Sequence, residues 1–396
     1  MAPQPLARRI GWPLLGGLAL VWVAAIAREW MTLARFAYQD LTHFTQGGQF
    51  VREGLSPYSA AFGDTGNHLP YIYPPIWALV FAPLSLLPTR LLEAAWTAAT
   101  LVALWALVSI AIRPLLEAED GDRRRRAVLV TVAAVLTLAL GPVAETLYFG
   151  QIGIFVVLAC LVDAVVLVQR PTRFRGILVG VATAIKLTPA LIVVHWVITR
   201  QWRAAATAMV TTAVCWGIAA VALPAMFADY FFGGVMFGIT GHVGAERVSN
   251  QSIFGLLTRL LGQAPPTVLW GALALATACV GLWLARRAHL RGDLLAAISI
   301  VGLTTLLVSP MSWQHHAVWV VPAIGALIGD GRDRRRLLGG LAALVLLYSP
   351  TQGAQIAALV GFTEYWNLLY VILIGALAWV VTRTPGSAAR PGPARG

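Results

Sequence analysis

Residues 36–75 read FAYQDLTHFTQGGQFVREGLSPYSAAFGDTGNHLPYIYPP, a polar and aromatic stretch between two strongly apolar runs. Connections this long are uncommon inside a compact domain, and those that do occur are often functional. Glycine and proline divide the stretch into short pieces, and residues 39–52 can form one helix lying at a membrane interface. We therefore expect residues 36–75 to form a large first loop with a functional role.

The composition is that of a membrane protein. Of 396 residues, 58% are hydrophobic and only 12% are charged, whereas soluble proteins average about 25% charged residues. Many apolar runs reach about 20 residues, the length that a helix needs to cross the bilayer core. These features predict an all-α polytopic membrane protein with a single transmembrane domain at residues 1–382. The basic tail at residues 383–396 is expected to be disordered.

Arginine clusters account for the net charge of +12 and orient the chain. They stand at the ends of apolar runs, where the positive-inside rule places them in the cytoplasm. The clusters are Arg8 and Arg9; Arg123, Arg124, Arg125 and Arg126; Arg170, Arg173 and Arg175; Arg200 and Arg203; Arg286, Arg287 and Arg291; Arg332, Arg334, Arg335 and Arg336; and Arg383, Arg390 and Arg395. We expect about twelve crossings of the cell membrane, both termini in the cytoplasm and an extracytoplasmic first loop. The charge needs no nucleic-acid partner.

Two apolar regions are interrupted. Residues 76–112 contain prolines and an arginine, and we expect a short re-entrant piece followed by one full crossing. Residues 176–203 have arginines at both ends and a Lys-Leu-Thr-Pro break in the middle. Broken helices at membrane depth are tolerated where they line a cavity or pack within the protein. We expect this segment to form a helical hairpin with Lys186 at its tip.

Polar residues gather at the outer ends of the expected helices, opposite the arginine clusters. The set comprises Asp40, Tyr71, Tyr73, Glu145, Gln151, Lys186, Asn250, Gln251, Trp313, His315 and His316. Convergence of titratable and polar groups on one side favours an extracytoplasmic active site.

Lys186 and Asp40 each allow two interpretations. Lys186 is the only lysine in the chain, and an ionisable group at membrane depth usually marks a function, such as holding a phosphate. The alternative is a lysine whose ammonium reaches the headgroups. Asp40 could cap the N-terminus of a helix. It could also be a desolvated carboxylate that takes a proton from a sugar hydroxyl.

The pair His315-His316 favours hydrogen bonding to a phosphate or hydroxyl over metal binding. Adjacent helical residues point about 100° apart, so at most one ring is expected to face a site. No third ligand stands at a suitable spacing, so no metal or cofactor is predicted, although a divalent cation stays possible. The rings of Tyr73 and Trp313 belong either to an interfacial belt or to the wall of a sugar or prenyl site. The sequence has no phosphate-binding glycine loop, so the donor should be membrane-borne.

Six motifs occur in an order that resembles glycosyltransferase family 87, integral-membrane enzymes of the class C glycosyltransferase fold. They are Asp40-Leu41; Tyr73-Pro74-Pro75; Gly150-Gln151; Lys186-Leu187-Thr188-Pro189; Asn250-Gln251-Ser252; and Ser309-Pro310-Met311-Ser312-Trp313-Gln314-His315-His316. Together they span most of the chain. The resemblance is greatest to polyprenyl-phosphate-mannose-dependent α-1,2-mannosyltransferases that extend phosphatidylinositol mannosides.

This resemblance implies mannosyl transfer on the outer face, from a polyprenyl-phosphate donor to a lipid-linked mannoside, with inversion of the donor's β linkage to α. Asp40 would be the base for the acceptor hydroxyl, and Lys186, His315 and His316 would contact the phosphate. The remaining residues expected to bind substrate are His43, Tyr73, Gln151, Asn250, Gln251 and Trp313. The implied partners are the lipid bilayer, the lipid-linked donor and the glycolipid acceptor.

Three alternatives stay open. The same fold could use another polyprenyl-phosphate sugar, such as arabinose or glucose. A transporter or lipid flippase would be expected to show repeat symmetry and charges near the middle of several spans. A non-catalytic scaffold would leave the lone Lys186 and the ordered motifs unexplained.

Overall fold

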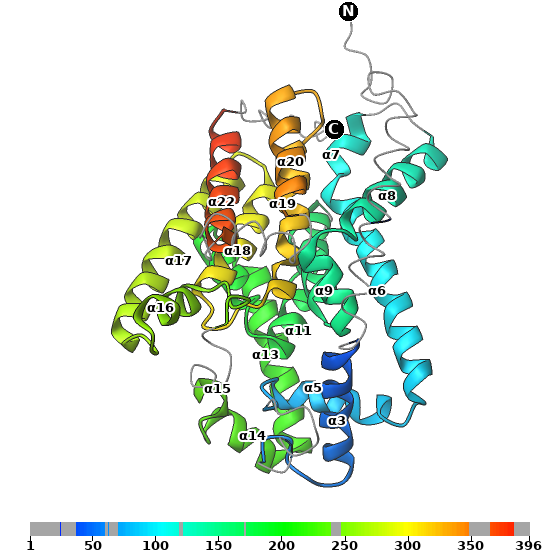
Figure 1. Ribbon diagram of the computed structural model, residues 1–396, viewed down its shortest axis with the longest axis vertical. Coiled ribbons are helices and arrows are strands. Elements are labelled where there is room, and N and C mark those ends of the chain that lie inside the picture. Colours follow the sequence, from blue (N-terminus) through cyan, green and yellow to red (C-terminus); the bar gives the residue numbers. More distant parts are fainter. Residues whose placement is uncertain are drawn as a thin grey trace, which may run out of the picture.

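The computed structural model describes residues 24, 37–59, 62, 70–118, 122–169, 172–238, 247–347 and 365–383. Every regular element assigned within these ranges is helical (Figure 1). The expected first crossing at residues 11–32 lies outside the described residues except for residue 24, and so does the expected tail except for Arg383. The helices are α3 (Gln39–Arg52), α5 (Pro75–Leu84), α6 (Thr89–Ala111), α7 (Arg113–Ala118), α8 (Arg123–Thr137), α9 (Gly141–Phe149), α10 (Gly153–Leu161), η2 (Val162–Val166), η3 (Leu167–Gln169), α11 (Ile177–Ile185), α12 (Ala190–Ile198), α13 (Trp202–Ala222), α14 (Pro224–Phe231), α15 (Val235–Gly238), α16 (Ile253–Leu261), α17 (Thr267–Leu290), α18 (Leu294–Val308), η5 (Gln314–Trp319), α19 (Val320–Ile328), α20 (Arg334–Leu346) and α22 (Tyr365–Arg383).

Three of the described helices, α6, α13 and α17, are long and apolar enough to cross a membrane. The 23 residues of α6 extend about 35 Å, slightly more than a bilayer core. A fourth candidate is α9 together with α10 and η2, which are bent by 118° at a short break. Several other apolar helices have 10–17 residues, among them α5 and α18. The fold is thus that of a helical membrane protein, and the number of twelve crossings stays a prediction.

The centre of the described bundle is α18. Thirteen of its fifteen residues are buried, as expected for a helix that is apolar on all sides. It lies against α17, where Gly281 has no space for a side chain because a Cβ atom would come within 2.1 Å of the Thr304 hydroxyl. Small residues of this kind let membrane helices approach closely.

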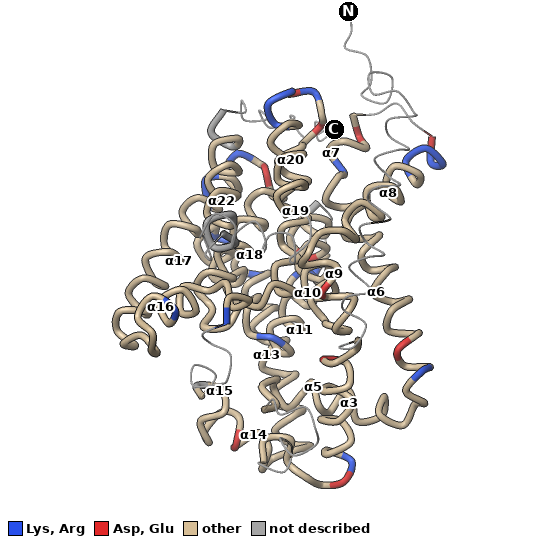
Figure 2. Tube along the Cα trace, viewed as in Figure 1, with Lys and Arg blue, Asp and Glu red and all other residues tan. Residues whose placement is uncertain are grey.

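The two ends of the molecule differ in charge. Helices α3, α5 and α14 lie at one end, and α7, α8 and α20 lie at the other (Figure 1). Figure 2 shows Lys and Arg concentrated around the starts of α8 and α20. Three helices that start in this arginine-rich region have an Asp at the N-cap, namely Asp122, Asp293 and Asp333, and each accepts a backbone N–H bond. Such caps satisfy the free N–H groups of a helix start.

Several expected elements are present with the expected boundaries. The helix expected at residues 39–52 is α3, Gln39–Arg52. Residues 76–112 contain a short helix, α5, followed by the long α6. The region 176–203 is broken into α11 and α12, and Lys186 is the first residue after α11.

Candidate functional site

Asp40 lies in the first turn of α3 and does not cap it. The N-cap residue is Tyr38, which has a left-handed backbone (φ 59°) and forms no side-chain cap. Tyr38 is held by its N–H, which donates to the Tyr148 carbonyl at 2.8 Å, and by a 2.8 Å hydrogen bond between its hydroxyl and that of Thr97. The capping interpretation of Asp40 is therefore wrong, because the helix begins one residue before it.

Gly150 brings Gln151 up to the start of α3. Its φ of 67° ends α9 in the left-handed region, and a Cβ atom there would lie 2.6 Å from the Cβ atom of Leu41. Glycine is the residue that meets both conditions without strain. The side chain of Gln151 then forms a hydrogen bond with the carboxylate of Asp40.

The amide of Gln151 also joins Asp40 to Tyr73. The Tyr73 hydroxyl donates to Gln151 Oε1 at 3.2 Å, and the Ile152 N–H donates to the same oxygen at 3.3 Å. Since both bonds use the oxygen, the NH₂ group is the end that donates to the Asp40 carboxylate. Tyr73 and Gln151 are both buried, at 8% and 3% exposure.

Lys186 stands where α11 ends in extended backbone (φ −143°, ψ 119°). Its ammonium nitrogen lies 5.9 Å from the centre of the Tyr73 ring. It interacts electrostatically with Asp40 and also with His315 and His316. Residues from α3, α11 and η5 that are far apart in the sequence thus form one charged cluster.

Burial raises the pKa of the Asp40 carboxyl to about 6, and the Gln151 hydrogen bond and the charge of Lys186 limit the rise. A carboxylate with this pKa is mostly ionised at neutral pH and is a stronger base than an exposed aspartate. Burial also raises the pKa of Tyr73, so its hydroxyl remains a donor. The chemistry available at this position is removal of a proton from a hydroxyl group.

The histidine pair lies in η5, against the C-terminal half of α9. The Thr146 hydroxyl donates to the His315 carbonyl at 3.0 Å. The Nδ1 atom of His315 is 3.8 Å from Glu145 Oε2. The His316 ring is 4.5 Å from the His315 ring and nearly perpendicular to it, and it hydrogen-bonds the backbone of Met311. The N–H of His316 donates to the carbonyl of Trp313, which is the N-cap residue of η5.

Asn250 and Gln251 hold the segment that leads into η5. Asn250 Oδ1 accepts the Ser312 N–H at 3.0 Å, and Asn250 Nδ2 donates to the Pro310 carbonyl at 3.3 Å. The Gln251 N–H donates to the Ser312 carbonyl at 2.8 Å. Both residues are fully buried, at 0% exposure. Their contacts stabilise the approach to His315, and substrate binding by these two residues stays a prediction.

His43 lies apart from the charged cluster, on the buried face of α3. Its ring stacks on Tyr71 at 5.5 Å and meets the edge of Phe62 at 4.9 Å. Burial lowers the pKa of His43 to about 4, so the ring is neutral at physiological pH. These contacts make His43 part of the packing between α3 and the residues that follow it.

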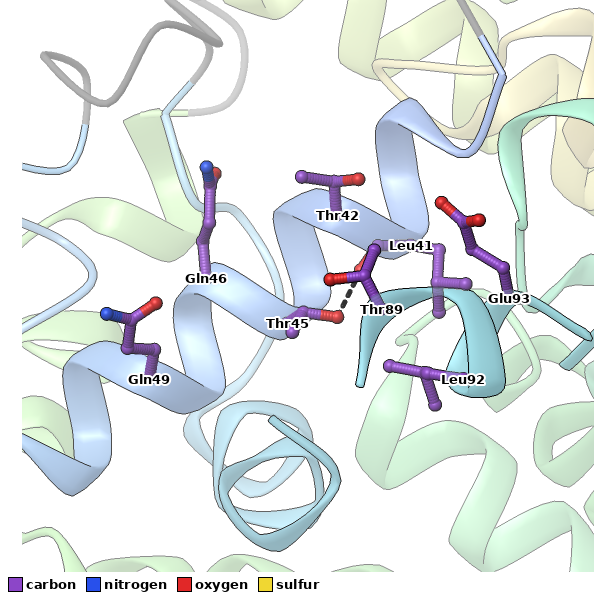
Figure 3. Close-up of a pocket in the computed structure, with 8 residues that line it drawn as sticks. All are labelled: Leu41, Thr42, Thr45, Gln46, Gln49, Thr89, Leu92 and Glu93. Atoms are coloured by element: carbon purple, nitrogen blue, oxygen red, sulfur yellow. Dashed lines mark hydrogen bonds between the residues drawn. The ribbon is translucent and has the colours of Figure 1, made fainter. Parts of the chain in front are cut away.

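A groove of about 190 Å³ runs between α3 and the start of α6 (Figure 3). Thr42, Thr45 and Gln49 line one wall, and Glu93 lies on the other. By helical periodicity these α3 residues lie on the side away from Asp40. The groove is therefore separate from the cluster around Lys186.

Metal ligands do not converge in the part of the chain that the structure describes: no three His, Cys, Asp or Glu side chains there form a group that could hold a metal ion.

Glu145 is one of the polar residues expected at the outer ends of the helices, and the sequence predicts no particular role for it. Its signal was a single acid inside the apolar run 141–153. The contact with His315 arises only in the folded chain, because the two residues are 170 positions apart.

Comparison with known proteins identifies the family. The family model described as glycosyltransferase family 87 matches residues 71–310, a range that includes Tyr73, Gln151, Lys186 and Asn250 and begins after Asp40. A polyprenol-phosphate-mannose-dependent α-(1-2)-phosphatidylinositol mannoside mannosyltransferase of Mycobacterium tuberculosis is 30% identical over 96% of this chain and 94% of its own length. Its namesake in Mycolicibacterium smegmatis is 33% identical over 81% of this chain and 76% of its own length.

A third relative, from Mycobacterium tuberculosis, is named as a polyprenol-phosphate-mannose-dependent α-(1-2)-phosphatidylinositol pentamannoside mannosyltransferase. It is 37% identical over 76% of this chain and 69% of its own length. The comparison with solved structures found no significant match. A match over more than half of the chain, together with relatives that extend over most of it, places this protein in glycosyltransferase family 87.

Proposed function

We propose that this protein transfers mannose from a polyprenyl-phosphate donor to a lipid-linked mannoside acceptor, with Asp40 as the general base. The observation that carries the proposal is the connection of Asp40 to Lys186 in one cluster, which also includes Gln151 and Tyr73. A base and a fixed cation at one site are the two groups that a displacement at a glycosyl phosphate requires.

The reaction is a single displacement. The acceptor hydroxyl oxygen attacks the anomeric carbon of the donor sugar, and its proton goes to the Asp40 carboxylate. The bond between the anomeric carbon and the phosphate oxygen breaks, and the electron pair stays on the phosphate. Attack from the opposite face inverts the β linkage of the donor to α. No covalent sugar intermediate forms, unlike in a retaining glycosidase.

Each member of the cluster has a role in this step. Lys186 offsets the charge that develops on the leaving phosphate, and the histidine pair is placed to hydrogen-bond it. Gln151 keeps the Asp40 carboxylate in place through its NH₂ group, and the Tyr73 hydroxyl fixes the orientation of that amide. Because the groups are held before substrate arrives, little reorganisation is needed during the reaction.

The relatives' names supply the specific substrates of the proposal: a polyprenyl-phosphate-mannose donor, a phosphatidylinositol mannoside acceptor and an α-1,2 linkage. The charge distribution supplies the orientation. Helix α3 lies at the end opposite the arginine-rich starts of α8 and α20 (Figures 1 and 2). Since basic ends face the cytoplasm, the site is extracytoplasmic and both termini are cytoplasmic, in a class C fold with about twelve crossings.

The test uses the purified full chain in liposomes with polyprenyl-phosphate mannose and a phosphatidylinositol mannoside. Asp40→Asn should abolish product formation and leave donor binding nearly unchanged. The matched control is Asp122→Asn, an exposed N-cap position where asparagine caps as well as aspartate, and it should keep full activity. Normal transfer by Asp40→Asn overturns the role of Asp40.

The same assay separates the competing functions. Polyprenyl-phosphate arabinose and polyprenyl-phosphate glucose should give no product. Transfer of either sugar in preference to mannose would show that the donor carries that sugar and not mannose. Movement of the lipid across the liposome membrane without any glycosylated product would identify a flippase instead.

A further inference from the structure

Two neighbouring residues of α9 contact the same histidine of η5. Glu145 Oε2 lies 3.8 Å from Nδ1 of His315, and the Thr146 hydroxyl donates to the His315 carbonyl at 3.0 Å. The side chains of Glu145 and His315 are 15% and 11% exposed. Thr146 thus fixes the backbone of His315, while Glu145 places a carboxylate beside its ring.

The second ring nitrogen of His315 has no partner among the described residues. Nε2 is buried, and no hydrogen-bond partner for it exists among the residues that the structure describes. Buried polar atoms are nearly always paired, so an unpaired one calls for a ligand or another explanation. The electrostatic interaction of His315 with Lys186 shows that the ring and the ammonium belong to one charged cluster.

The surrounding charges act in opposite directions on His315. Burial and the charge of Lys186 hold the pKa of His315 well below its ordinary value, so the ring is neutral before substrate binds. Glu145 favours a positive charge on the ring, and Tyr370 is the group that interacts with Glu145 from α22. Without the carboxylate, an imidazolium beside the ammonium would be an unpaired buried cation, which is costly.

We propose that Glu145 is a positioning residue for the donor phosphate: its carboxylate lies on the Nδ1 side of His315, so that the ring can take up a second proton when the phosphate binds and present Nε2–H to it. This inference rests on the proposed function. The 3.8 Å separation is too long for a hydrogen bond, so Glu145 acts through its charge once the ring is protonated. Binding of a phosphate at Nε2 adds the anion that the doubly protonated ring needs on its other side.

The first experiment compares Glu145→Gln and Glu145→Asp with the wild type in the liposome assay. Glu145→Gln should raise the KM for the polyprenyl-phosphate donor about tenfold, and kcat and the acceptor KM should stay within about twofold. Glu145→Asp should restore most of the donor affinity. Glu117→Gln, an exposed control on α7, should behave as the wild type. An unchanged donor KM in Glu145→Gln overturns the inference.

The pH dependence gives a readout that a merely structural role would not move. Loss of the carboxylate disfavours the imidazolium, so in Glu145→Gln the donor KM should begin to rise at a lower pH than in the wild type. The thermal unfolding temperature of the variant should remain close to that of the wild type. Parallel pH profiles with an equal loss of kcat would show a general structural defect and contradict the positioning role.

A double-mutant cycle tests whether Glu145 acts through His315. In a His315→Gln background, Glu145→Gln should cause no further rise in the donor KM. Multiplying effects of the two substitutions would overturn the inference. If the wild type transfers mannose and these variants match it, the inference alone fails. If the wild type forms no mannosylated product, the proposed function fails.

Discussion

The hydroxyl of Tyr73 donates to Oε1 of Gln151 at 3.2 Å and thereby decides which end of that amide meets Asp40. The relationship crosses three separate elements, since Tyr73 precedes α5, Gln151 follows α9 and Asp40 lies in α3. A carboxylate that receives an N–H bond from a fixed amide is held in one orientation. The orientation of the Asp40 carboxylate therefore depends on two neutral residues, Gln151 and Tyr73.

Gln151→Glu replaces the NH₂ donor by a second carboxyl group beside Asp40. Like charges at this distance disfavour ionisation, so the acidic limb of the kcat/KM profile should move up by about one pH unit; activity should then fall about tenfold at pH 5 and about twofold at pH 7. Gln49→Glu, on the exposed side of α3, is the control and should keep the wild-type profile. A Gln151→Glu enzyme with an unshifted profile would show that this amide has no influence on the base.

With Asp40 as the proposed base, its pKa of about 6 should set the acidic limb of the wild-type pH profile. A general base works in its ionised form, so kcat/KM should rise as pH passes through about 6. It should fall again at higher pH, because burial lowers the pKa of Lys186 to about 7 and the proposed phosphate site then loses its charge. Initial rates in liposomes between pH 5 and pH 8 measure this profile. A rate that is constant down to pH 5 would mean that the base has an ordinary aspartate pKa or is another residue.

The same shift has the opposite effect on stability. The pKa of Asp40 is higher in the folded protein than its ordinary value of 3.8, so its contribution to stability is greatest below pH 3.8 and is lost as pH rises through 6. The neutral isostere in Asp40→Asn avoids this loss. At pH 8 the variant should therefore unfold at the same temperature as the wild type or a higher one, while being inactive.

Short-range sequence patterns predicted those parts of the site that depend only on neighbouring residues. Residues 39–52 form α3 as expected because glycine and proline follow the segment, and the break at Lys186 was visible from Lys-Leu-Thr-Pro. The residue at which α3 starts is harder to predict from sequence. Tyr38 takes the left-handed N-cap conformation through contacts with Tyr148 and Thr97 rather than through a capping side chain.

Residue type alone could not separate binding groups from supporting ones. His43 resembled a site histidine in sequence, yet it packs between the rings of Tyr71 and Phe62. Glu145 drew no assignment, yet it lies beside His315. Both outcomes depend on contacts between segments distant in the sequence, and no periodicity or spacing within either segment carries that information.

The proposed role of Lys186 is tested by the effect of its substitution on donor affinity. Lys186→Gln removes a charged contact to the phosphate worth about 1.5–3 kcal/mol, which corresponds to a rise in the donor KM of roughly 10- to 100-fold. Lys186→Arg should recover part of the affinity, because it keeps the charge but not the shape. The exposed Arg203→Gln controls for loss of a positive charge. An unchanged donor KM in Lys186→Gln would remove Lys186 from the phosphate site.

Asn250 offers a test between substrate contact and structural support. Its Oδ1 accepts from the Ser312 N–H and the Ser252 hydroxyl, and its Nδ2 donates to the Pro310 carbonyl. Asn250→Ala leaves the buried Ser312 N–H without this acceptor, which should cost about 1–3 kcal/mol of stability and lower the unfolding temperature.

The activity of Asn250→Ala should fall through kcat and donor KM together, because the segment that carries His315 and His316 loses its anchor. Asn250→Asp keeps the acceptor oxygen but replaces the donor to Pro310 by a second oxygen in a fully buried site, so its loss of stability should be smaller at low pH, where the carboxyl is neutral, than at neutral pH. The unfolding temperatures of both variants in detergent, together with their kcat and donor KM values, test these expectations. If Asn250→Ala unfolds at the wild-type temperature and loses only substrate affinity, Asn250 contacts the substrate directly, as the sequence had predicted.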